Sequence, residues 1–385
     1  MYLGIERFPR IIQGILGWLW IADPFRDEQI SHTATSNFPT ADYAVFIFDH
    51  VNGAGVRIIC IIAWHVDDGL AGANDRTFLD RTKAQIAERF GISDLGPITK
   101  YLGVQFVRDR TTRELWMHQE DYIVYLLEEH GMTNCNPVSL PMDPNFPFGR
   151  PTDIHPHVDD LQTEFRKLVG ELLYLAMYTR PDIALTVMRL AQHNVLAELC
   201  HYAAAKHVLR YLAGTINLRT HYGGPGATPD LHGFSDSDWA SCPEDRISVS
   251  GYVWFLNGGP VSHSAKKQTT QALSSTEAEY MALTAAVQDG LWLQSFFGCL
   301  GIPLSLPLRL FADNAGAIAL SKEAANHLRT KHIDLRYHFI RRHVEDKTFL
   351  PVWLSTHKNT ADIFTKVLPR PIFVQHRSGL SLVSR

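Results

Sequence analysis

"LHGFSDSDWA", residues 231–240, predicts a β-strand in which acidic residues alternate with small ones. Side chains of a strand point alternately to its two faces, so Phe234, Asp236 and Asp238 share one face. Two carboxylates therefore leave this strand in the same direction. Asp236 and Asp238 are therefore both candidate metal ligands.

Three further acids lie where predicted elements begin or end. "LSSTEAEYMALTAAVQDGLWLQ" opens with a capping box, Ser274 to Glu277, and continues as an amphipathic helix. Glu277 caps this helix, whereas Glu279 lies beside the apolar stripe and faces the sheet. "LRLFADNAGAIAL" places Asp313 at the end of a strand, directly before a helix start at Asn314. "FLPVWLSTHKNTADIFTK" places Asp362 in the first turn of a helix capped by Asn359 or Thr360.

Asp236, Glu279, Asp313 and Asp362 can thus converge on one edge of a sheet. Four carboxylates in one place repel one another unless a cation joins them, and hard oxygen ligands favour Mg²⁺ or Mn²⁺ over zinc. Two ions about 3.5 to 4 Å apart would activate water and stabilise the leaving oxygen of a phosphodiester. Taken singly, each acid is more typical of a helix cap or a strand end without a chemical role; the order and spacing of the four acids together favour a metal site.

The pattern of elements divides the chain into four segments. Residues 227–385 predict strand, hairpin at Asn257 to Gly259, strand, and then alternating helices and strands, a mixed α/β domain. Residues 146–226 predict a linker followed by a connection of two or more helices. Residues 41–145 predict a hairpin at "NGAG", then the apolar run Ile58 to Ile62 followed by Asp67 and Asp68, and after it a helix from about Arg76 to Phe90. In the same segment "YLGVQFV" predicts a strand and "EDYIVYLLEEHGM" a helix. Residues 1–40 have no clear periodicity, and no fold is predicted for them.

The composition is that of an ordinary globular protein, with 385 residues, 45% of them hydrophobic, and a net charge of −4. This balance gives no global basic signature, so a nucleic-acid partner must be recognised locally. Lys322 to Lys347 holds seven basic residues against four acidic ones, which is also typical of a solvated helix face. Five cysteines without CxxC spacing fit a reducing compartment. The apolar run Ile11 to Ile21 is too short to span a bilayer, so no membrane partner is predicted.

From about Tyr43 onward the chain resembles the C-terminal part of the Pol polyprotein of copia-type long-terminal-repeat retrotransposons, where the end of reverse transcriptase is followed by ribonuclease H. The resemblance rests on many ordered motifs. They are "HVDD", "DLGPITKYLGVQF", "HQEDYIVYLLEEHGM", "RKLVGELLYLAMYTRPDIA", "AAKHVLRYLAGT", "SDSDWA", "DRISVSGYVWFLNGG", "SHSAKKQ", "ALSSTEAEYMAL", "DNAGAIAL", "KHIDLRYHFIR" and "NTADIFTK".

The resemblance implies an α/β fold class: a C-terminal ribonuclease H-like mixed sheet with flanking helices, preceded by a truncated polymerase palm and thumb and a helical connection. It implies hydrolysis of the RNA strand of an RNA/DNA hybrid with two Mg²⁺ or Mn²⁺ ions, and contact with the nucleic-acid backbone. The catalytic and metal-binding acids would be Asp236, Glu279, Asp313 and Asp362, with Asp238 as a structural partner rather than a metal ligand. Asn314, Lys331 and His332 would contact substrate. By analogy with retrotransposons, the protein would act in the cytoplasm and the nucleus; its oligomeric state is left open.

The polymerase part departs from the family. Asp67 and Asp68 match the family's aspartate pair, but His65 stands where the family has tyrosine. The third palm aspartate and the fingers have no match in residues 1–50, and Asp49 lies only 18 residues before Asp67. We therefore expect a polymerase remnant that does not extend a primer, with residues 1–40 derived from a rearranged or mispredicted gene start. Two alternatives remain: a polymerase completed by a partner or by a longer chain, and a catalytically dead module that binds nucleic acid.

Overall fold

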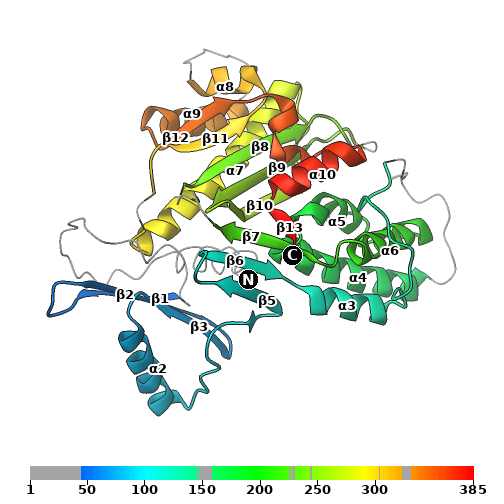
Figure 1. Ribbon diagram of the computed structural model, residues 1–385. Helices are drawn as coiled ribbons and strands as arrows, with labels where there is room; N and C mark the ends of the chain where they lie inside the picture. The colour runs from blue at the N-terminus through cyan, green and yellow to red at the C-terminus, as the bar shows by residue number, and fades with distance from the viewer. Residues whose placement is uncertain are drawn as a thin grey trace.

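The protein is described by a computed structural model that places residues 45–144, 146, 158–224, 227, 230–242, 245–302, 304–322 and 331–385. The unassigned segment 1–40 and most of the linker before residue 158 lie outside the described residues. The described chain forms three β-sheets with helices packed between and around them (Figure 1). None of the described helices has the length and apolar character needed to cross a membrane.

The first sheet holds three antiparallel strands in the order β1-β2-β3. Its elements are β1 Val45–Val51, β2 Arg57–His65, β3 Asp68–Ala73 and the following helix α2 Arg76–Phe90. Asn52 forms the predicted β1–β2 hairpin, because its side-chain oxygen accepts from the N–H groups of Ala54 and Val56 at 3.0 and 2.9 Å. Asp75 caps α2 by accepting from the Phe78 N–H at 2.8 Å, and Gly91 ends it in the left-handed conformation. The predicted bounds of α2 are confirmed.

The second sheet, in the order β13-β7-β6-β5-β4, joins strands from distant parts of the chain. Its strands are β4 Lys100–Tyr101, β5 Val104–Asp109, β6 Glu114–His118, β7 Leu218–Gly223 and β13 Leu382–Ser384. The single strand predicted at "YLGVQFV" is divided into the antiparallel strands β4 and β5, and β6 was not predicted. The predicted helix that follows is present as α3 Glu120–Glu129. Strand β7 lies in the segment predicted as a helical connection, so this connection also contributes to a sheet.

Four helical elements follow α3 along the chain and pack around a common core. They are α4 Val158–Tyr178, η1 Pro181–Ile183, α5 Ala184–Ala191 and α6 Leu199–Ala213. Their fully buried side chains include Phe165, Leu172 and Leu209. The same core includes Val253 and Phe255 from the C-terminal sheet. The predicted connection of two or more helices is therefore present, and it packs against the C-terminal sheet.

The third sheet has the order β10-β9-β8-β11-β12, with β8, β9 and β10 antiparallel and β8, β11 and β12 parallel. Its strands are β8 His232–Asp238, β9 Val249–Leu256, β10 Gly259–Lys267, β11 Leu308–Ala312 and β12 Phe349–Trp353. The remaining elements are α7 Ser275–Cys299, α8 Ala315–Lys322, α9 Lys331–Glu345, η2 Thr356–Lys358, η3 Thr360–Phe364 and α10 Arg370–Gly379.

Strand β9 is buried on both faces, and its side chains alternate between two cores. Tyr252, Trp254 and Leu256 join the core that includes α7, whereas Val253 and Phe255 join the core of the helical connection. The Trp254 indole donates to the Ala286 carbonyl of α7 at 3.1 Å. The C-terminal sheet is thus covered on one face by α7 and on the other by η3 and the connection, as the predicted mixed α/β domain with flanking helices requires.

Candidate active site

Three of the four predicted acids meet at one end of the C-terminal sheet. Asp236 is fully buried in β8, Glu279 is 7% exposed in the second turn of α7, and Asp313 follows the last residue of β11. One carboxylate oxygen from each lies within 4.8 Å of the other two. We call Asp236, Glu279, Asp313 and the neighbouring Asp362 the acidic cluster.

Helix α7 presents Glu279 because its N-terminus is fixed and one face is buried. The Ser274 hydroxyl accepts from the Glu277 N–H at 3.2 Å, and the Glu277 carboxylate accepts from the Leu273 N–H at 2.8 Å. Tyr280 and Leu283 are buried against the sheet. These contacts confirm the predicted positions of the two glutamates: Glu277 caps the helix and Glu279 faces inward.

Asp313 lies in the turn between β11 and α8, and hydrogen bonds on both sides hold this turn. The Asn314 side-chain oxygen accepts from the Ala317 N–H at 2.9 Å, which caps α8. The Trp353 indole donates to the Asp313 carbonyl at 3.1 Å, although its side chain is largely exposed. Asn314, predicted to contact substrate, is therefore engaged as a helix cap, while Trp353 anchors the backbone of Asp313.

Asp362 reaches the cluster from η3, which is attached to β8 by Asn359. The buried Asn359 amide donates to the Ser235 carbonyl at 3.0 Å, and its oxygen accepts from the Ala361 N–H at 3.2 Å. Of the two predicted caps, Asn359 and Thr360, the structure has Asn359. The segment that it caps is a 3-10 helix rather than the predicted α-helix. The contact brings Asp362, which is 4% exposed, beside Asp236.

Lys366 and Thr365 are site residues that the sequence analysis did not identify. The Lys366 ammonium donates to Asp236 Oδ1 at 3.0 Å and to Asp362 Oδ1 at 3.1 Å. The Thr365 hydroxyl donates to the other oxygen of Asp236. The available signal was the spacing of Asp362 and Lys366, four residues apart, at which oppositely charged side chains meet on a helix.

Burial and mutual repulsion favour the protonated forms of these acids. Burial, and then the Asp362 charge, raise the pKa of Asp236 to about 7, against the opposing effects of Lys366 and Thr365. Burial, followed by the charges of Asp236 and Asp313, raises the pKa of Glu279 to about 9. Burial also raises the pKa of Asp362. Burial lowers the pKa of Lys366, but Asp236 and Asp362 outweigh it, so the pKa lies above its usual value.

The donor set fits a hard divalent cation. Glu279 Oε2 is buried and accepts no hydrogen bond, so this oxygen is free to bind a cation together with oxygens of Asp236 and Asp313. A buried, unpaired acceptor is costly unless a cation or donor meets it. Asp238, half-buried at the end of β8, is not among the three clustered acids. Burial raises the pKa of Asp238 above its ordinary value.

The remaining predicted residues do not join this cluster in the described structure. Lys331 and His332 begin α9, and their side chains lie outside the described residues. Asp67 and Asp68 are exposed at the β2–β3 hairpin, where His65 pairs with Asp68. Within the described ranges, neither belongs to a group of three potential ligand atoms closer than 4.8 Å.

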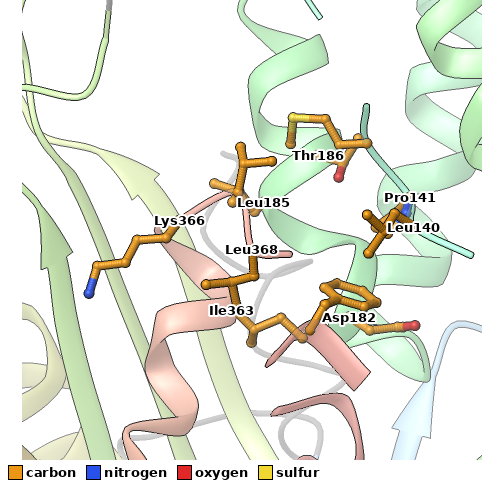
Figure 2. A pocket seen from close by; sticks show the side chains of 11 residues that line it. Leu140, Pro141, Asp182, Leu185, Thr186, Ile363, Lys366 and Leu368 are labelled. Carbon is orange, nitrogen blue, oxygen red and sulfur yellow. The ribbon is translucent and has the colours of Figure 1, made fainter. Parts of the chain in front are cut away.

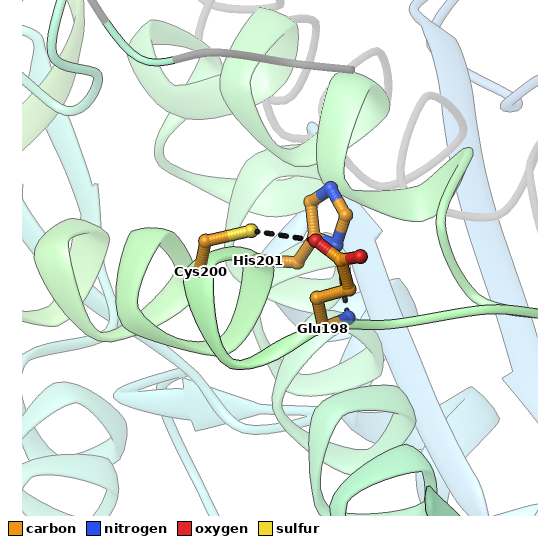
Figure 3. Close-up of side chains that lie close together, drawn as sticks. All are labelled: Glu198, Cys200 and His201. Carbon is orange, nitrogen blue, oxygen red and sulfur yellow. Dashed lines mark hydrogen bonds between the residues drawn. The ribbon is translucent and has the colours of Figure 1, made fainter. Parts of the chain in front are cut away.

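Glu198, Cys200 and His201 form a second group of potential ligands at the start of α6 (Figure 3). Their hydrogen bonds are local: the Cys200 thiol donates to the Glu198 carboxylate at 3.4 Å, and the Glu198 N–H donates to His201 Nδ1 at 3.0 Å. The His201 ring is buried and stacks on His193 with ring centroids 3.9 Å apart. Since Nδ1 is already an acceptor for the helix N-terminus, this group is better described as a cap.

Comparisons with known proteins find sequence similarity along most of the chain. A family profile described as reverse transcriptase (RNA-dependent DNA polymerase) matches residues 27–144, so the match begins inside the segment to which the sequence analysis assigns no fold. The chain is 37% identical over 316 residues to the retrovirus-related Pol polyprotein from transposon TNT 1-94 of Nicotiana tabacum, covering 81% of this chain and 24% of that protein. It is 30% identical over 229 residues to the putative transposon Ty5-1 protein of Saccharomyces cerevisiae, covering 59% of this chain and 73% of that protein.

Among solved structures, LC11 ribonuclease H1 in complex with an RNA/DNA hybrid aligns with 35% of this chain and 94% of its own, at 16% identity and a TM-score of 0.28. The chain spans less than a quarter of the length of the curated Pol relatives. The predicted α/β fold class is confirmed: a mixed sheet with flanking helices follows a segment that matches the reverse transcriptase profile. The chain therefore belongs to the Pol polyproteins of copia-type retrotransposons and corresponds to part of their length.

Proposed function

We propose that this chain hydrolyses the RNA strand of RNA/DNA hybrids at the acidic cluster and leaves 3′-hydroxyl and 5′-phosphate ends. The observation that supports the proposal most strongly is the meeting of Asp236, Glu279 and Asp313 within 4.8 Å, with a buried carboxylate oxygen left unpaired. Asp362 adds a fourth acid beside Asp236. Two Mg²⁺ or Mn²⁺ ions held there would polarise the scissile phosphate and activate water.

The protein's own contribution is to hold these oxygens rigidly and apart from bulk solvent. Asp236 sits in the central strand, Glu279 on a helix capped by Ser274, and Asp362 on a segment attached to β8 by Asn359. The described elements already hold one oxygen each of Asp236, Glu279 and Asp313 within 4.8 Å of one another, so the electrostatic field of these carboxylates is in place before the phosphate arrives. Selection of hybrids would depend on the 2′-hydroxyls of one strand and on duplex shape.

The test is cleavage of an end-labelled RNA/DNA hybrid in Mg²⁺ by the chain and by Asp313→Asn. We expect the variant to lose roughly 100-fold or more of the cleavage rate, since a metal-holding carboxylate supplies several kcal/mol to the transition state. Asp121→Asn is the matched control, because Asp121 is an exposed acid of α3 that pairs with Lys100 at 3.4 Å. A folded wild-type chain that leaves the hybrid intact would overturn the proposal.

We further propose that the polymerase part does not extend primers by itself. In the part of the chain that the structure describes, no third potential metal ligand lies within 4.8 Å of Asp67 and Asp68. Two-metal polymerisation needs a complete set of acids that holds both ions and the incoming triphosphate in line. A primer-template with dNTPs, incubated alongside the hybrid, should show no extension. Clear incorporation that is lost in Asp67→Asn would instead establish a working polymerase.

A further inference from the structure

The two sides of the acidic cluster differ in how their oxygens are used. On one side, Glu279 Oε2 accepts no hydrogen bond. On the other side, both oxygens of Asp236 accept, from Lys366 at 3.0 Å and from Thr365. The same Lys366 ammonium donates to Asp362 at 3.1 Å. A positive charge is therefore hydrogen-bonded to both Asp236 and Asp362, whereas no described donor meets Glu279 Oε2.

The position of this ammonium is fixed by the packing of its own side chain. The Lys366 stem lines a small apolar pocket together with Leu185, Ile363 and Leu368, and Figure 2 shows the ammonium pointing out of that pocket. Apolar packing of a lysine stem holds the charged head at the pocket edge. Leu185 belongs to α5, so the helical connection contributes to placing a charge in the C-terminal site. The side chain keeps 29% of its exposure, which leaves it a route towards solvent.

We propose that Lys366 is an intramolecular counter-ion that stands in for a cation between Asp236 and Asp362 and must withdraw before a second divalent ion can use these two carboxylates. The inference rests on the proposed function of the acidic cluster as a metal site. It follows that the two cation positions are unequal: the Asp236, Glu279 and Asp313 side fills first, and the Asp362 side fills later and more weakly. Like charges cannot share the same carboxylate oxygens at hydrogen-bond distance without strong repulsion.

The test is a calorimetric titration of the full chain with Mn²⁺ in the absence of nucleic acid, combined with thermal unfolding without metal. Lys366→Met should bind the second ion about 10- to 100-fold more tightly than the wild type, the range over which groups around metal ligands alter affinity. The same variant should unfold at a lower temperature without metal, because Asp236 and Asp362 lose their counter-ion. Lys366→Arg should resemble the wild type in both measurements.

Lys167→Met is the matched control, because Lys167 pairs with Glu129 at 2.6 Å on the surface, away from the cluster. It should change neither the affinity of the second ion nor the metal-free unfolding temperature by a comparable amount. Should Lys366→Met fail to fold without metal, Lys366→Gln, which retains a donor without the charge, replaces it in the titration. Unchanged Mn²⁺ affinities in the charge-free variant would overturn the inference.

These readouts separate the inference from the proposed function. An altered second-ion affinity in a chain that cleaves no hybrid would support the counter-ion and refute the nuclease. Cleavage by a wild-type chain whose metal binding does not depend on Lys366 would support the nuclease and refute the counter-ion.

Discussion

Glu279 and Asp236 make the stability of the metal-free protein depend on pH in a direction that is unusual for acids. Their pKa values are raised to about 9 and about 7, mainly by burial, from ordinary values near 4 in the unfolded chain. Between about pH 4 and about pH 9 these two acids hold more protons in the folded than in the unfolded chain, so their contribution to the free energy of unfolding falls as the pH rises. Below about pH 6.5 buried histidines act in the opposite direction, for example His201, whose pKa burial lowers to about 4. We therefore expect the metal-free unfolding temperature to decrease from about pH 7 to about pH 9.

Glu279→Gln isolates the contribution of one residue to this effect. The variant removes the charge and keeps the shape, so its unfolding temperature should fall less steeply with pH, and near pH 9 it should exceed that of the wild type. Mg²⁺ should raise the wild-type unfolding temperature most at high pH, where the carboxylates are ionised. Parallel pH profiles for the two proteins would contradict the assignment of the raised pKa to Glu279.

At the residue scale, the sequence predicts the acids better than it predicts their partners. Glu279 is distinguished from Glu277 by helix periodicity, because a capping box and an apolar stripe define which face is buried. The contact of Lys366 with Asp236 spans 130 residues. This contact depends on how η3 packs on β8. The local spacing predicts only the second contact of Lys366, with Asp362 four residues before it.

At the scale of elements, helix α7 offers a matched pair of glycines that tests how closely it packs on the sheet. A Cβ at Gly290 would lie 2.5 Å from Trp254 Cζ2 and 2.9 Å from Phe349 Cε1, whereas a Cβ at Gly298 would meet nothing within 4 Å. Gly290→Ala should lower the free energy of unfolding by about 1 to 3 kcal/mol through overpacking, despite the better helix propensity of alanine.

Gly298→Ala is the control on the same helix. With open space around it, this change should leave stability unchanged or raise it by up to about 1 kcal/mol. Urea denaturation of the two variants and the wild type measures both effects. Equal midpoints for Gly290→Ala and Gly298→Ala would show that α7 does not lie as close to Trp254 as described.

The elements that the sequence analysis did not identify share a physical cause. Strand β7, "LRTHYG", alternates as a strand should, with Leu218, Thr220 and Tyr222 buried, but it is short and polar and follows α6 closely. Strand β13 has only three residues. Both depend on pairing with distant strands, and such long-range pairing leaves little trace in local propensity. The strands of the C-terminal sheet can be predicted because hairpin or helix signals lie at their ends, although β11 and β12 have only five residues each.

At the scale of the whole molecule, the C-terminal unit and the helical connection share one core. Val253 and Phe255 of β9 and Phe364 of η3 are buried in the same cluster as Leu172 and Leu209 of the connection. A fragment of residues 230–385 would expose this face, because the helices that cover it would be absent. Exposed apolar patches of this kind promote association.

We therefore expect residues 230–385 to unfold at lower urea concentration than residues 158–385, to bind more of a hydrophobic dye and to aggregate more readily. Urea denaturation and dye fluorescence at matched concentrations measure the difference. Identical midpoints and dye binding would indicate that the C-terminal unit is stable without the connection. The result also tests the predicted boundary near residue 227, which cuts between β7 and β8.

The second sheet also has a consequence for synthesis on the ribosome. Strand β6 pairs with β7, and 100 residues separate His118 from Leu218. At roughly 5 to 20 residues per second, the ribosome needs on the order of 5 to 20 seconds to supply the partner. During that interval the apolar side chains of Leu115 and Met117 belong to a strand whose free edge can pair with another nascent chain. Polysomes that crowd several copies together would then favour co-aggregation, and a holding chaperone would protect the growing chain until β7 emerges.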